Sequence, residues 1–286
     1  MITSTTTGSV VAEAPTGWHV RESGDPDSQA VVFLHGAGLS GRMWAEHMAR
    51  LAAFHCLAPD LPGSGLSKRF PWTSSIEVAD GIAALIKTRV GAGRAHVVGL
   101  SVGGAIAHTL LARHPGLVDR VVIDGAGILP WWGNGPYLMG IAAIAPFLHT
   151  RPVIAALSRS VGRMPPEVQA ELRVASRRAF YESFADALGT RATRAQIGAT
   201  CPTLLVAGER ETVVRQSNAA LAALMPSAVA RFVPGLGHGW LGTRHDLHLE
   251  MVEAWLTSGQ LPSGLLVERP WRGAVARLRR ELDARG

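Results

Sequence analysis

The segment Gly99-Leu100-Ser101-Val102-Gly103 decides the fold of this chain. An apolar run at residues 95–98 precedes it and is typical of a buried strand, while residues 104–112 have the pattern of a helix. A serine with glycine two positions away on both sides fits a very tight strand-to-helix turn, in which the serine backbone adopts a positive φ. Such a turn holds the hydroxyl out of the sheet, where a base can reach it. The segment therefore predicts a serine nucleophile at the end of a buried strand.

Apolar, β-branched runs alternate with helical patterns on both sides of this segment. Buried parallel strands are predicted at residues 31–34, 56–58, 96–98, 121–123 and 203–206, a last strand at 231–233 and an antiparallel edge strand at 17–23. Helical patterns fall near residues 41–53, 75–90, 102–114, 214–225 and 243–257. The alternation predicts an α/β fold with a doubly wound, mostly parallel sheet, in which ligands bind beyond the carboxyl ends of the strands.

Residues 128–200 interrupt this alternation, because they are helical throughout and longer than an ordinary crossover. We interpret them as a helical cap over the catalytic edge, with a packing insert that has no role at the site as the alternative. The core then comprises residues 1–127 and 201–257. Residues 258–286 form a C-terminal tail with a short helix, which could contact another subunit, so a homo-oligomer is left open.

Composition narrows the class of protein. The 286 residues are 47% hydrophobic and 17% charged, as expected of a soluble enzyme with a large core. The net charge is +6, but the arginines are scattered and form no basic run, so we expect no nucleic-acid partner. The longest apolar stretch, residues 137–148, is too short to cross a bilayer, so we expect no membrane partner. The N-terminus lacks the pattern of a signal peptide and both cysteines fit reduced core positions, which favours a cytoplasmic protein.

A serine hydroxyl is a weak nucleophile near neutral pH and needs a base within hydrogen-bonding distance, together with an acid that orients the base. His238 is the best candidate base, in the loop Pro234-Gly235-Leu236-Gly237-His238-Gly239-Trp240. This loop follows the last predicted strand and precedes a helix, which places it at the carboxyl edge of the sheet. The neighbouring glycines would let the ring turn toward the serine.

The acid is expected just after the end of a strand that comes later in the chain than the serine and earlier than the base. Glu211 fits this position, since it follows Gly208 by three residues after the strand 203–206, near the start of a helix. A carboxylate there could also serve only to complement the helix dipole. Asp124, which ends the strand 121–123, is the main alternative acid, and Glu209 is a further one.

The tetrahedral intermediate of acyl transfer also needs hydrogen-bond donors for its oxyanion. The run His35-Gly36-Ala37-Gly38 follows an early strand and opens a loop whose glycines leave backbone N–H groups uncovered. The expected donors are the N–H groups of Ala37 and of Val102, the residue after the serine. His35 is interpreted as an anchor of the loop. No cluster has the spacing of metal ligands, so neither a metal nor a cofactor is expected.

Together these segments resemble the α/β-hydrolase superfamily. The resemblance rests on residues 35–38, 60–67, 99–104, 208–211 and 237–238, and it covers roughly residues 15–257. It implies an eight-stranded sheet with a helical cap between strands six and seven. It also implies a triad of Ser101, Glu211 and His238. Most members have aspartate where this chain has Glu211, which keeps Asp124 open as the acid.

These features predict a serine hydrolase that cleaves a carboxylic ester or lactone of a small to medium apolar substrate. The expected substrate-binding residues are Gly36, Trp131, Trp132, Tyr137, Met139 and Trp240. The aromatic and apolar ones could instead form only the core of the cap. Alternatives on the same fold are a carbon–carbon bond hydrolase, a cofactor-free haloperoxidase or dioxygenase, and a non-catalytic ligand-binding receptor.

Overall fold

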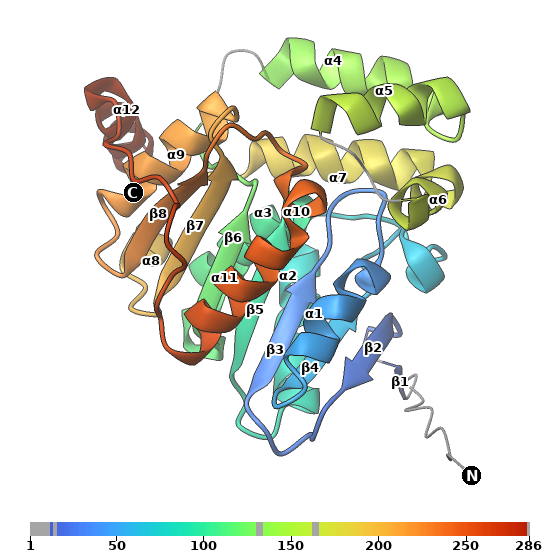
Figure 1. Cartoon of the computed structure of the whole chain (residues 1–286), viewed down its shortest axis with the longest axis horizontal. Helices are drawn as coiled ribbons and strands as arrows, with labels where there is room; N and C mark the ends of the chain where they lie inside the picture. The colour runs from blue at the N-terminus through green and yellow to red at the C-terminus, as the bar shows by residue number, and fades with distance from the viewer. Residues whose placement is uncertain (1–11, 14–15, 130–133, 162–165, 285–286) are drawn as a thin grey trace.

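A central sheet of eight strands organises the molecule (Figure 1). The computed structural model describes residues 12–13, 16–129, 134–161 and 166–284. The strands are β1 (Ala12–Glu13), β2 (His19–Ser23), β3 (Ala30–Leu34), β4 (His55–Pro59), β5 (Ala95–Leu100), β6 (Val118–Asp124), β7 (Thr203–Gly208) and β8 (Ala228–Val233). Their order is β1-β2-β4-β3-β5-β6-β7-β8, and all pairs are parallel except those that β2 makes with β1 and β4. The predicted doubly wound, mostly parallel sheet is confirmed.

Helices cover both faces of this sheet, which explains why the inner strands are apolar in continuous runs. On one face lie α1 (Ala45–Arg50) and α11 (His245–Thr257), and on the other α2 (Ser75–Arg89), α3 (Val102–Arg113) and α9 (Thr212–Ala222) (Figure 1). Successive side chains of a strand point to opposite faces. Val31 and Phe33 of β3 accordingly join the apolar cluster under α1 and α11, while Val32 and Leu34 join the cluster under α2 and α3.

The register of the parallel strands brings several strand ends level at one edge. Leu100 of β5 pairs with Asp124 of β6, and Asp124 in turn pairs with Val206 of β7. The loops that follow β5 and β6 therefore start side by side, and β7 continues two residues further, to Gly208. Residues far apart in the chain meet here because the carboxyl ends of these parallel strands lie at the same edge.

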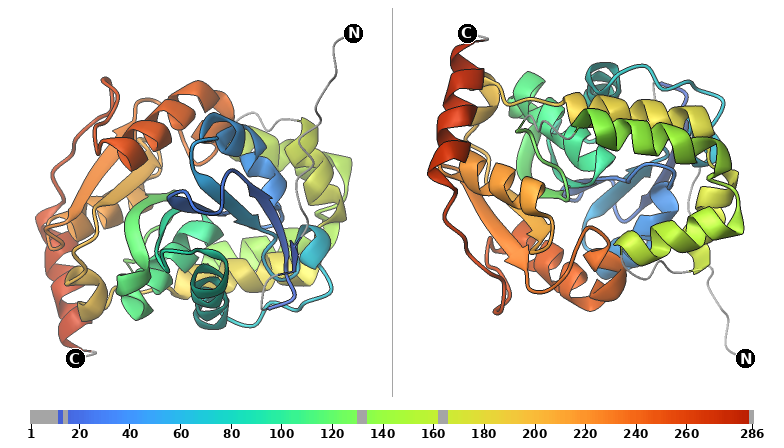
Figure 2. Two further views of the ribbon diagram at one scale, coloured as in Figure 1. Left: turned by 90° about the horizontal axis from the view of Figure 1, so that it is seen from below. Right: turned by 90° about the horizontal axis from the view of Figure 1, so that it is seen from above.

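A group of helices between β6 and β7 lies beyond this carboxyl edge. It comprises α4 (Asn134–Ile144), α5 (Arg151–Val161), α6 (Pro166–Val174) and α7 (Arg177–Gly189), which the right-hand view of Figure 2 shows from above. We call them the inserted helices. The helix α7 begins at Arg177 because the Ser176 side chain caps it by accepting a hydrogen bond from the N–H of Ala179.

The remaining elements are short or C-terminal. They are the 3₁₀ turns Gly41–Trp44, Gly65–Ser67, Pro115–Leu117 and Ala145–Phe147, the short helices α8 (Arg194–Ile197) and α10 (Trp240–Thr243), and α12 (Arg272–Asp283). The tail folds back onto the core of the same chain. Leu266 pairs with Phe232 of β8, Arg215 forms an ion pair with Glu268 at 2.9 Å, and Leu278 of α12 is fully buried.

The turn between β5 and α3 has the tight geometry that its glycines predict. Ser101 has φ 55° and ψ −115°, and it is the one non-glycine residue with positive φ in the described part of the chain. The turn brings α3 so close to β3 that a Cβ atom on Gly103 would lie 2.1 Å from the carbonyl oxygen of Leu34. A side chain at position 103 therefore cannot be accommodated without moving backbone.

We expect Gly103→Ala to lower the free energy of unfolding by about 2 kcal/mol or more, because the added methyl collides with backbone in a close-packed core. Urea denaturation monitored by circular dichroism measures this loss. Gly116→Ala is the matched control, since no atom lies within 4 Å of a Cβ at that position. Equal stability of the two variants would contradict the packing described here.

Candidate active site

Three side chains from separate loops form a hydrogen-bonded chain at the carboxyl edge. Ser101 stands between β5 and α3, His238 on the loop between β8 and α10, and Glu211 at the start of α9. The Oγ of Ser101 lies 3.1 Å from Nε2 of His238. The Nδ1 of His238 lies 2.7 Å from Oε2 of Glu211. The arrangement can pass a proton from the hydroxyl to the imidazole while the carboxylate holds the ring in the required tautomer.

Glu211 fits this place because its longer side chain folds back onto its own loop. Its second carboxylate oxygen, Oε1, accepts a hydrogen bond of 2.8 Å from the N–H of Gly208, at the end of β7. One oxygen thus fixes the carboxylate and the other meets His238. The side chain of Glu211 is one methylene longer than that of an aspartate, and it fits because it folds back over the turn of residues 208–211.

The two alternative acids lie elsewhere. The side chain of Asp124 is buried below the loop and accepts a hydrogen bond of 2.9 Å from the indole N–H of Trp240. Glu209 accepts one of 2.7 Å from the N–H of Gly235. Of the three carboxylates considered, Glu211 is the one placed on the imidazole.

The surroundings of His238 set its basicity. Burial lowers the pKa of the imidazole, but the charge and hydrogen bond of Glu211, with the charge of Asp124, raise it more, so the net pKa lies above the usual 6.5. The side chain remains 34% exposed. Because an imidazole accepts a proton only in its neutral form, the raised pKa moves the pH range in which His238 can act as a base upward.

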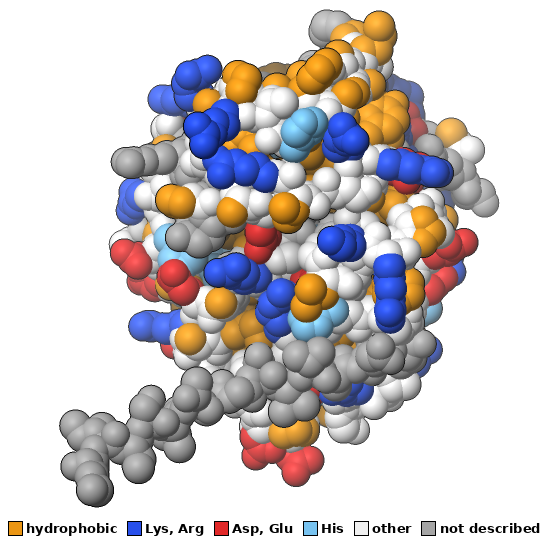
Figure 3. All heavy atoms as spheres, turned by 90° about the vertical axis from the view of Figure 1, so that its right-hand side faces the viewer, with side chains coloured by type: hydrophobic (Ala, Val, Ile, Leu, Met, Phe, Trp, Pro, Cys, Tyr) orange, Lys and Arg blue, Asp and Glu red, His pale blue; other side chains and the backbone are white. Residues whose placement is uncertain are grey.

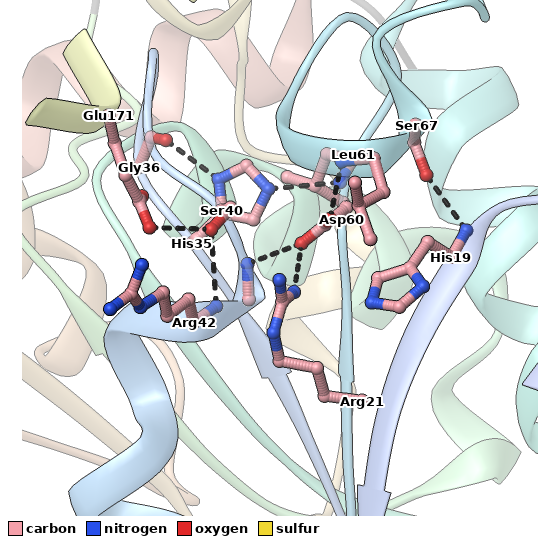
Figure 4. A network of polar contacts seen from close by, with 12 residues as sticks. His19, Arg21, His35, Gly36, Ser40, Arg42, Asp60, Leu61, Ser67 and Glu171 are labelled. Atoms are coloured by element: carbon pink, nitrogen blue, oxygen red, sulfur yellow. Dashed lines mark hydrogen bonds and ion pairs between the residues drawn. The ribbon is translucent and has the colours of Figure 1, made fainter. Parts of the chain in front are cut away.

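The loop after β3 is locked by a buried carboxylate (Figure 4). Asp60, directly after β4, accepts hydrogen bonds of 2.8 Å from the N–H groups of Gly41 and Leu66 and forms an ion pair with Arg21. Asp60 is fully buried, and these hydrogen bonds and the ion pair offset the cost of removing its carboxylate from water. The loops that follow β3 and β4 are thereby fixed to each other.

His35 is a second anchor of the same loop (Figure 4). Its Nε2 accepts a hydrogen bond of 2.9 Å from the N–H of Leu61. The ring proton must then sit on Nδ1, which donates to the carbonyl of Gly36 at 2.8 Å. Burial lowers the pKa of His35 to about 4, so the ring is neutral at physiological pH and keeps this pattern. These contacts fit an anchoring role for His35.

The expected oxyanion donors both lie beside the serine. Ala37 lines the cavity at Ser101, and the preceding Gly36 is so near that a Cβ on it would lie 3.6 Å from the Cβ of Ser101. Val102 is the first residue of α3, where a backbone N–H has no carbonyl one turn earlier in the helix. Both residues thus lie beside the serine, where the sequence predicts the two donors.

A cavity of about 590 Å³ opens at Ser101, between the core and the inserted helices. Its apolar wall comprises Leu39, Met43, Leu157, Val168, Leu172, Phe180, Phe184 and Leu241. Charged or titratable side chains also line it, namely Arg42, Glu46, Glu171 and His245. The cavity is large enough for a small-molecule ligand and is mainly apolar, with few polar groups to orient the ligand.

A hydrogen bond joins the inserted helices to the loop beside the serine. The Oγ of Ser40 donates to Oε1 of Glu171 on α6 at 2.8 Å and accepts a longer bond of 3.3 Å from the N–H of Arg42 (Figure 4). Burial raises the pKa of Glu171 above its ordinary value. The roof of the cavity is thus bonded directly to the loop that carries Ala37.

Several residues expected around the substrate are placed differently. Tyr137 and Met139 of α4 are 45% and 73% exposed, and neither lines the cavity. Tyr137 packs behind Phe184, with ring centroids 6.4 Å apart. Trp240 is buried beneath the His238 loop because its N–H bonds Asp124. Trp131 and Trp132 lie outside the described residues.

The helix α4 is apolar, yet none of its residues lines the cavity. Met139, Phe147 and Val174 are exposed on the outer surface of the inserted helices, and Figure 3 shows hydrophobic and basic side chains interspersed at that end of the molecule. The cavity wall comes instead from α5, α6 and α7. The spacing of Phe180 and Phe184, one helical turn apart, is the signal that could have identified this wall from sequence.

Residues 31–254 match the model of the alpha/beta hydrolase family. The chain belongs to the alpha/beta hydrolase family. It is 26% identical over 265 residues to an AB hydrolase superfamily protein of Gibberella zeae, covering 86% of each chain. It is 40% identical over 94 residues to a pimeloyl-[acyl-carrier protein] methyl ester esterase of Chromobacterium violaceum, covering 32% of this chain and 35% of the relative. A hydrolase from Pseudomonas aeruginosa PA01 has a similar structure, with a TM-score of 0.72, 22% identity, and coverage of 88% of this chain and 100% of that one.

Two further observations bear on the class of this hydrolase. Within the described ranges, no group of three or more His, Cys, Asp or Glu side chains has the arrangement of a metal site. None of the helices described is both long enough and apolar enough to cross a membrane.

In this hydrolase we expect the pKa of His238, measured by NMR titration of its imidazole, to exceed 6.5. Glu211→Gln should lower that pKa, because it removes the negative charge that favours the imidazolium and leaves the opposing effect of burial. Glu209→Gln is the control, since Glu209 bonds Gly235 on the same loop. An unchanged pKa in Glu211→Gln would show that the carboxylate does not govern the histidine.

Proposed function

We propose that the protein hydrolyses a carboxylic ester or lactone through an acyl-enzyme formed on Ser101. The observation that supports this most directly is the chain of hydrogen bonds from Ser101 through His238 to Glu211, with the serine facing an apolar cavity. Serine at this turn, imidazole and carboxylate are the groups that activate a hydroxyl for attack on a carbonyl.

In the first half of the reaction, His238 takes the proton of Ser101 as the oxygen attacks the carbonyl carbon. The negative charge that develops on the carbonyl oxygen is stabilised by the N–H groups of Ala37 and Val102, each worth on the order of 3 kcal/mol. Glu211 stabilises the imidazolium of His238. The histidine then gives its proton to the leaving alkoxide, and the ester carbon–oxygen bond breaks.

In the second half, water enters and His238 takes one of its protons as the water oxygen attacks the acyl carbon. The second tetrahedral intermediate uses the same two N–H donors. Its collapse breaks the bond to Ser101, and His238 returns the proton to the serine oxygen. The products are a carboxylic acid and an alcohol, or a hydroxy acid from a lactone, and the enzyme is unchanged.

The lining of the cavity supports an apolar substrate of small to medium size. Leu172, Phe180 and Phe184 of the inserted helices form an apolar roof near the serine, and a cavity of about 590 Å³ holds a ligand of this size. We propose that the inserted helices act as a cap that excludes water from the acyl group. The esterase named among the relatives acts on a methyl ester, which agrees with the proposed bond type.

We expect Ser101→Ala to reduce the turnover of a p-nitrophenyl acyl ester by at least about 10³-fold and to abolish labelling by a fluorophosphonate probe, because the attacking oxygen is gone. Ester turnover and in-gel labelling measure the two effects. Ser258→Ala, on the exposed C-terminal end of α11, is the control.

Three outcomes would overturn the proposal. Labelling that persists in Ser101→Ala would place the nucleophile elsewhere. Ester turnover unaffected by the loss of Ser101 would favour a different reaction on this fold, such as carbon–carbon bond cleavage. Tight ligand binding by the wild-type protein with no turnover across a panel of esters and lactones would favour a receptor.

A variant of the roof tests the proposed acyl pocket. Val168 on α6 lines the cavity, so we expect Val168→Phe to shorten the preferred acyl chain by a few carbons, because the larger ring fills space. The ratio of kcat/KM for a butanoate and a decanoate ester measures the change. Met139→Phe is the control, because Met139 faces solvent. An unchanged chain-length profile in Val168→Phe would place the acyl group outside this cavity.

A further inference from the structure

Asp124 is a buried carboxyl that no step of the proposed reaction uses. It ends β6 and its side chain is almost fully buried. One oxygen, Oδ1, accepts a hydrogen bond of 2.9 Å from the indole N–H of Trp240. The other, Oδ2, has no hydrogen-bond partner among the described residues and lies 3.6 Å from Nε2 of His248. A buried carboxyl is costly to retain, so its contacts should explain its presence.

The backbone around Asp124 touches both the serine and the histidine. The carbonyl of Asp124 accepts a hydrogen bond of 2.7 Å from the N–H of Ser101. The next residue, Gly125, has φ 65° and packs directly against the imidazole, since a Cβ on it would lie 2.7 Å from Cε1 of His238. The end of β6 therefore contacts both the backbone of Ser101 and the imidazole of His238.

The side chain of Asp124 reaches the same histidine from the other direction. Trp240 lies two residues after His238, and its backbone N–H donates a hydrogen bond of 3.1 Å to the carbonyl of Gly237. This bond closes the turn that contains His238, and the indole N–H of Trp240 joins the end of the turn to Asp124. A loop rich in glycine needs such ties, because its backbone is otherwise free to move.

We propose that Asp124 is a positioning residue for His238. Its side chain fixes the loop of residues 237–240 to the end of β6, whose carbonyl accepts the hydrogen bond from the N–H of Ser101. It also supplies a second carboxyl, besides that of Glu211, that stabilises the imidazolium form of His238. The inference rests on the proposed roles of Ser101 and His238.

Two buried histidines, His248 and His47, lie on the Oδ2 side of Asp124. Nδ1 of His248, on α11, lies 2.7 Å from Nε2 of His47, on α1. Burial lowers the pKa of His248 to about 3 and that of His47 well below its usual value, so both rings are neutral. When Asp124 holds its proton, Oδ2 can donate to Nε2 of His248, which then donates from Nδ1 to His47.

The charged and titratable groups that face Asp124 fix the sign of the pH effect. They are Glu211 at the start of α9, His238 on its loop and His248 on α11, with the His245–Glu46 pair beyond His47. Burial and the charge of Glu211 raise the pKa of Asp124 to about 8, against the hydrogen bond of Trp240 and the charge of protonated His238. Asp124 and His238 therefore titrate as a pair: the imidazolium favours the ionised carboxyl, and the ionised carboxyl favours the imidazolium. Loss of Asp124 should therefore lower the pKa of His238.

Three substitutions separate the positioning contact from the charge. Asp124→Asn keeps an oxygen for the indole but cannot ionise. Asp124→Leu removes the oxygen, and Trp240→Phe removes the N–H from the opposite side while filling most of the same space. Asp119→Asn is the control, because Asp119 is a carboxylate of the same strand that pairs with Arg94.

We expect Asp124→Asn to keep kcat on a p-nitrophenyl ester within about threefold and to shift the pKa of His238, measured by NMR, down by several tenths of a unit. The acid limb of kcat/KM should move to lower pH by the same amount. Asp124→Leu and Trp240→Phe should lower kcat at least about tenfold with KM within about twofold, because the base is displaced. Asp119→Asn should match the wild type throughout.

The proposal is overturned if Trp240→Phe has wild-type kcat, or if Asp124→Asn leaves the pKa of His238 unchanged. The NMR measurement needs no substrate, so it tests the inference even if the reaction class is different. Conversely, ester turnover that survives in Ser101→Ala would overturn the proposed function and leave the measured effect of Asp124 on His238 intact.

Discussion

The hydrogen bond from the N–H of Ser101 to the carbonyl of Asp124, 2.7 Å long, joins the ends of the neighbouring strands β5 and β6. It forms because β5 and β6 end level, and because the backbone turns sharply at Ser101 as it leaves the sheet. That sharp turn is tolerated only where α3 can approach β3 closely, which requires glycine at position 103. The position of the serine hydroxyl therefore depends on the packing of the whole central sheet.

The loops around this turn are held by polar groups in the interior. Asp60 and His35 lock the loop that carries Ala37, while Glu211 and Trp240 hold the loop that carries His238 through side-chain hydrogen bonds. The contacts of Asp60, His35 and Trp240 are buried, and that of Glu211 with His238 is partly buried. A hydrogen bond is strong in the interior, and a missing partner there is costly. The arrangement fixes the reacting groups before a substrate binds, which is the condition for electrostatic stabilisation of a transition state.

The inserted helices cover the cavity at this fixed edge. They contribute the apolar roof of the cavity through α5, α6 and α7, and α6 is bonded to the loop beside the serine through Glu171 and Ser40. The roof and the loop that carries Ala37 are therefore mechanically linked. A ligand that fills the cavity would contact both the roof and this loop.

The sequence by itself determined the strand–turn–helix unit at Ser101, the alternation that produces a parallel sheet, and the segments that carry His238 and Glu211. These signals are local, because glycine spacing, apolar runs and helix starts act within a few residues. The choice between Glu211 and Asp124 was not local. Both follow a strand of the same edge, and only the direction of each side chain separates them: Glu211 lies on the imidazole and Asp124 on Trp240.

The tertiary structure alone also decided which aromatic residues meet the cavity. The apolar sequence of α4 suggested a pocket wall, yet Phe180 and Phe184 of α7 line the cavity and Tyr137 and Met139 do not. Which face of a helix lies against a cavity depends on how several helices pack together, and composition does not record that. The same holds for Trp240, whose place was set by a buried carboxyl 116 residues away in the chain.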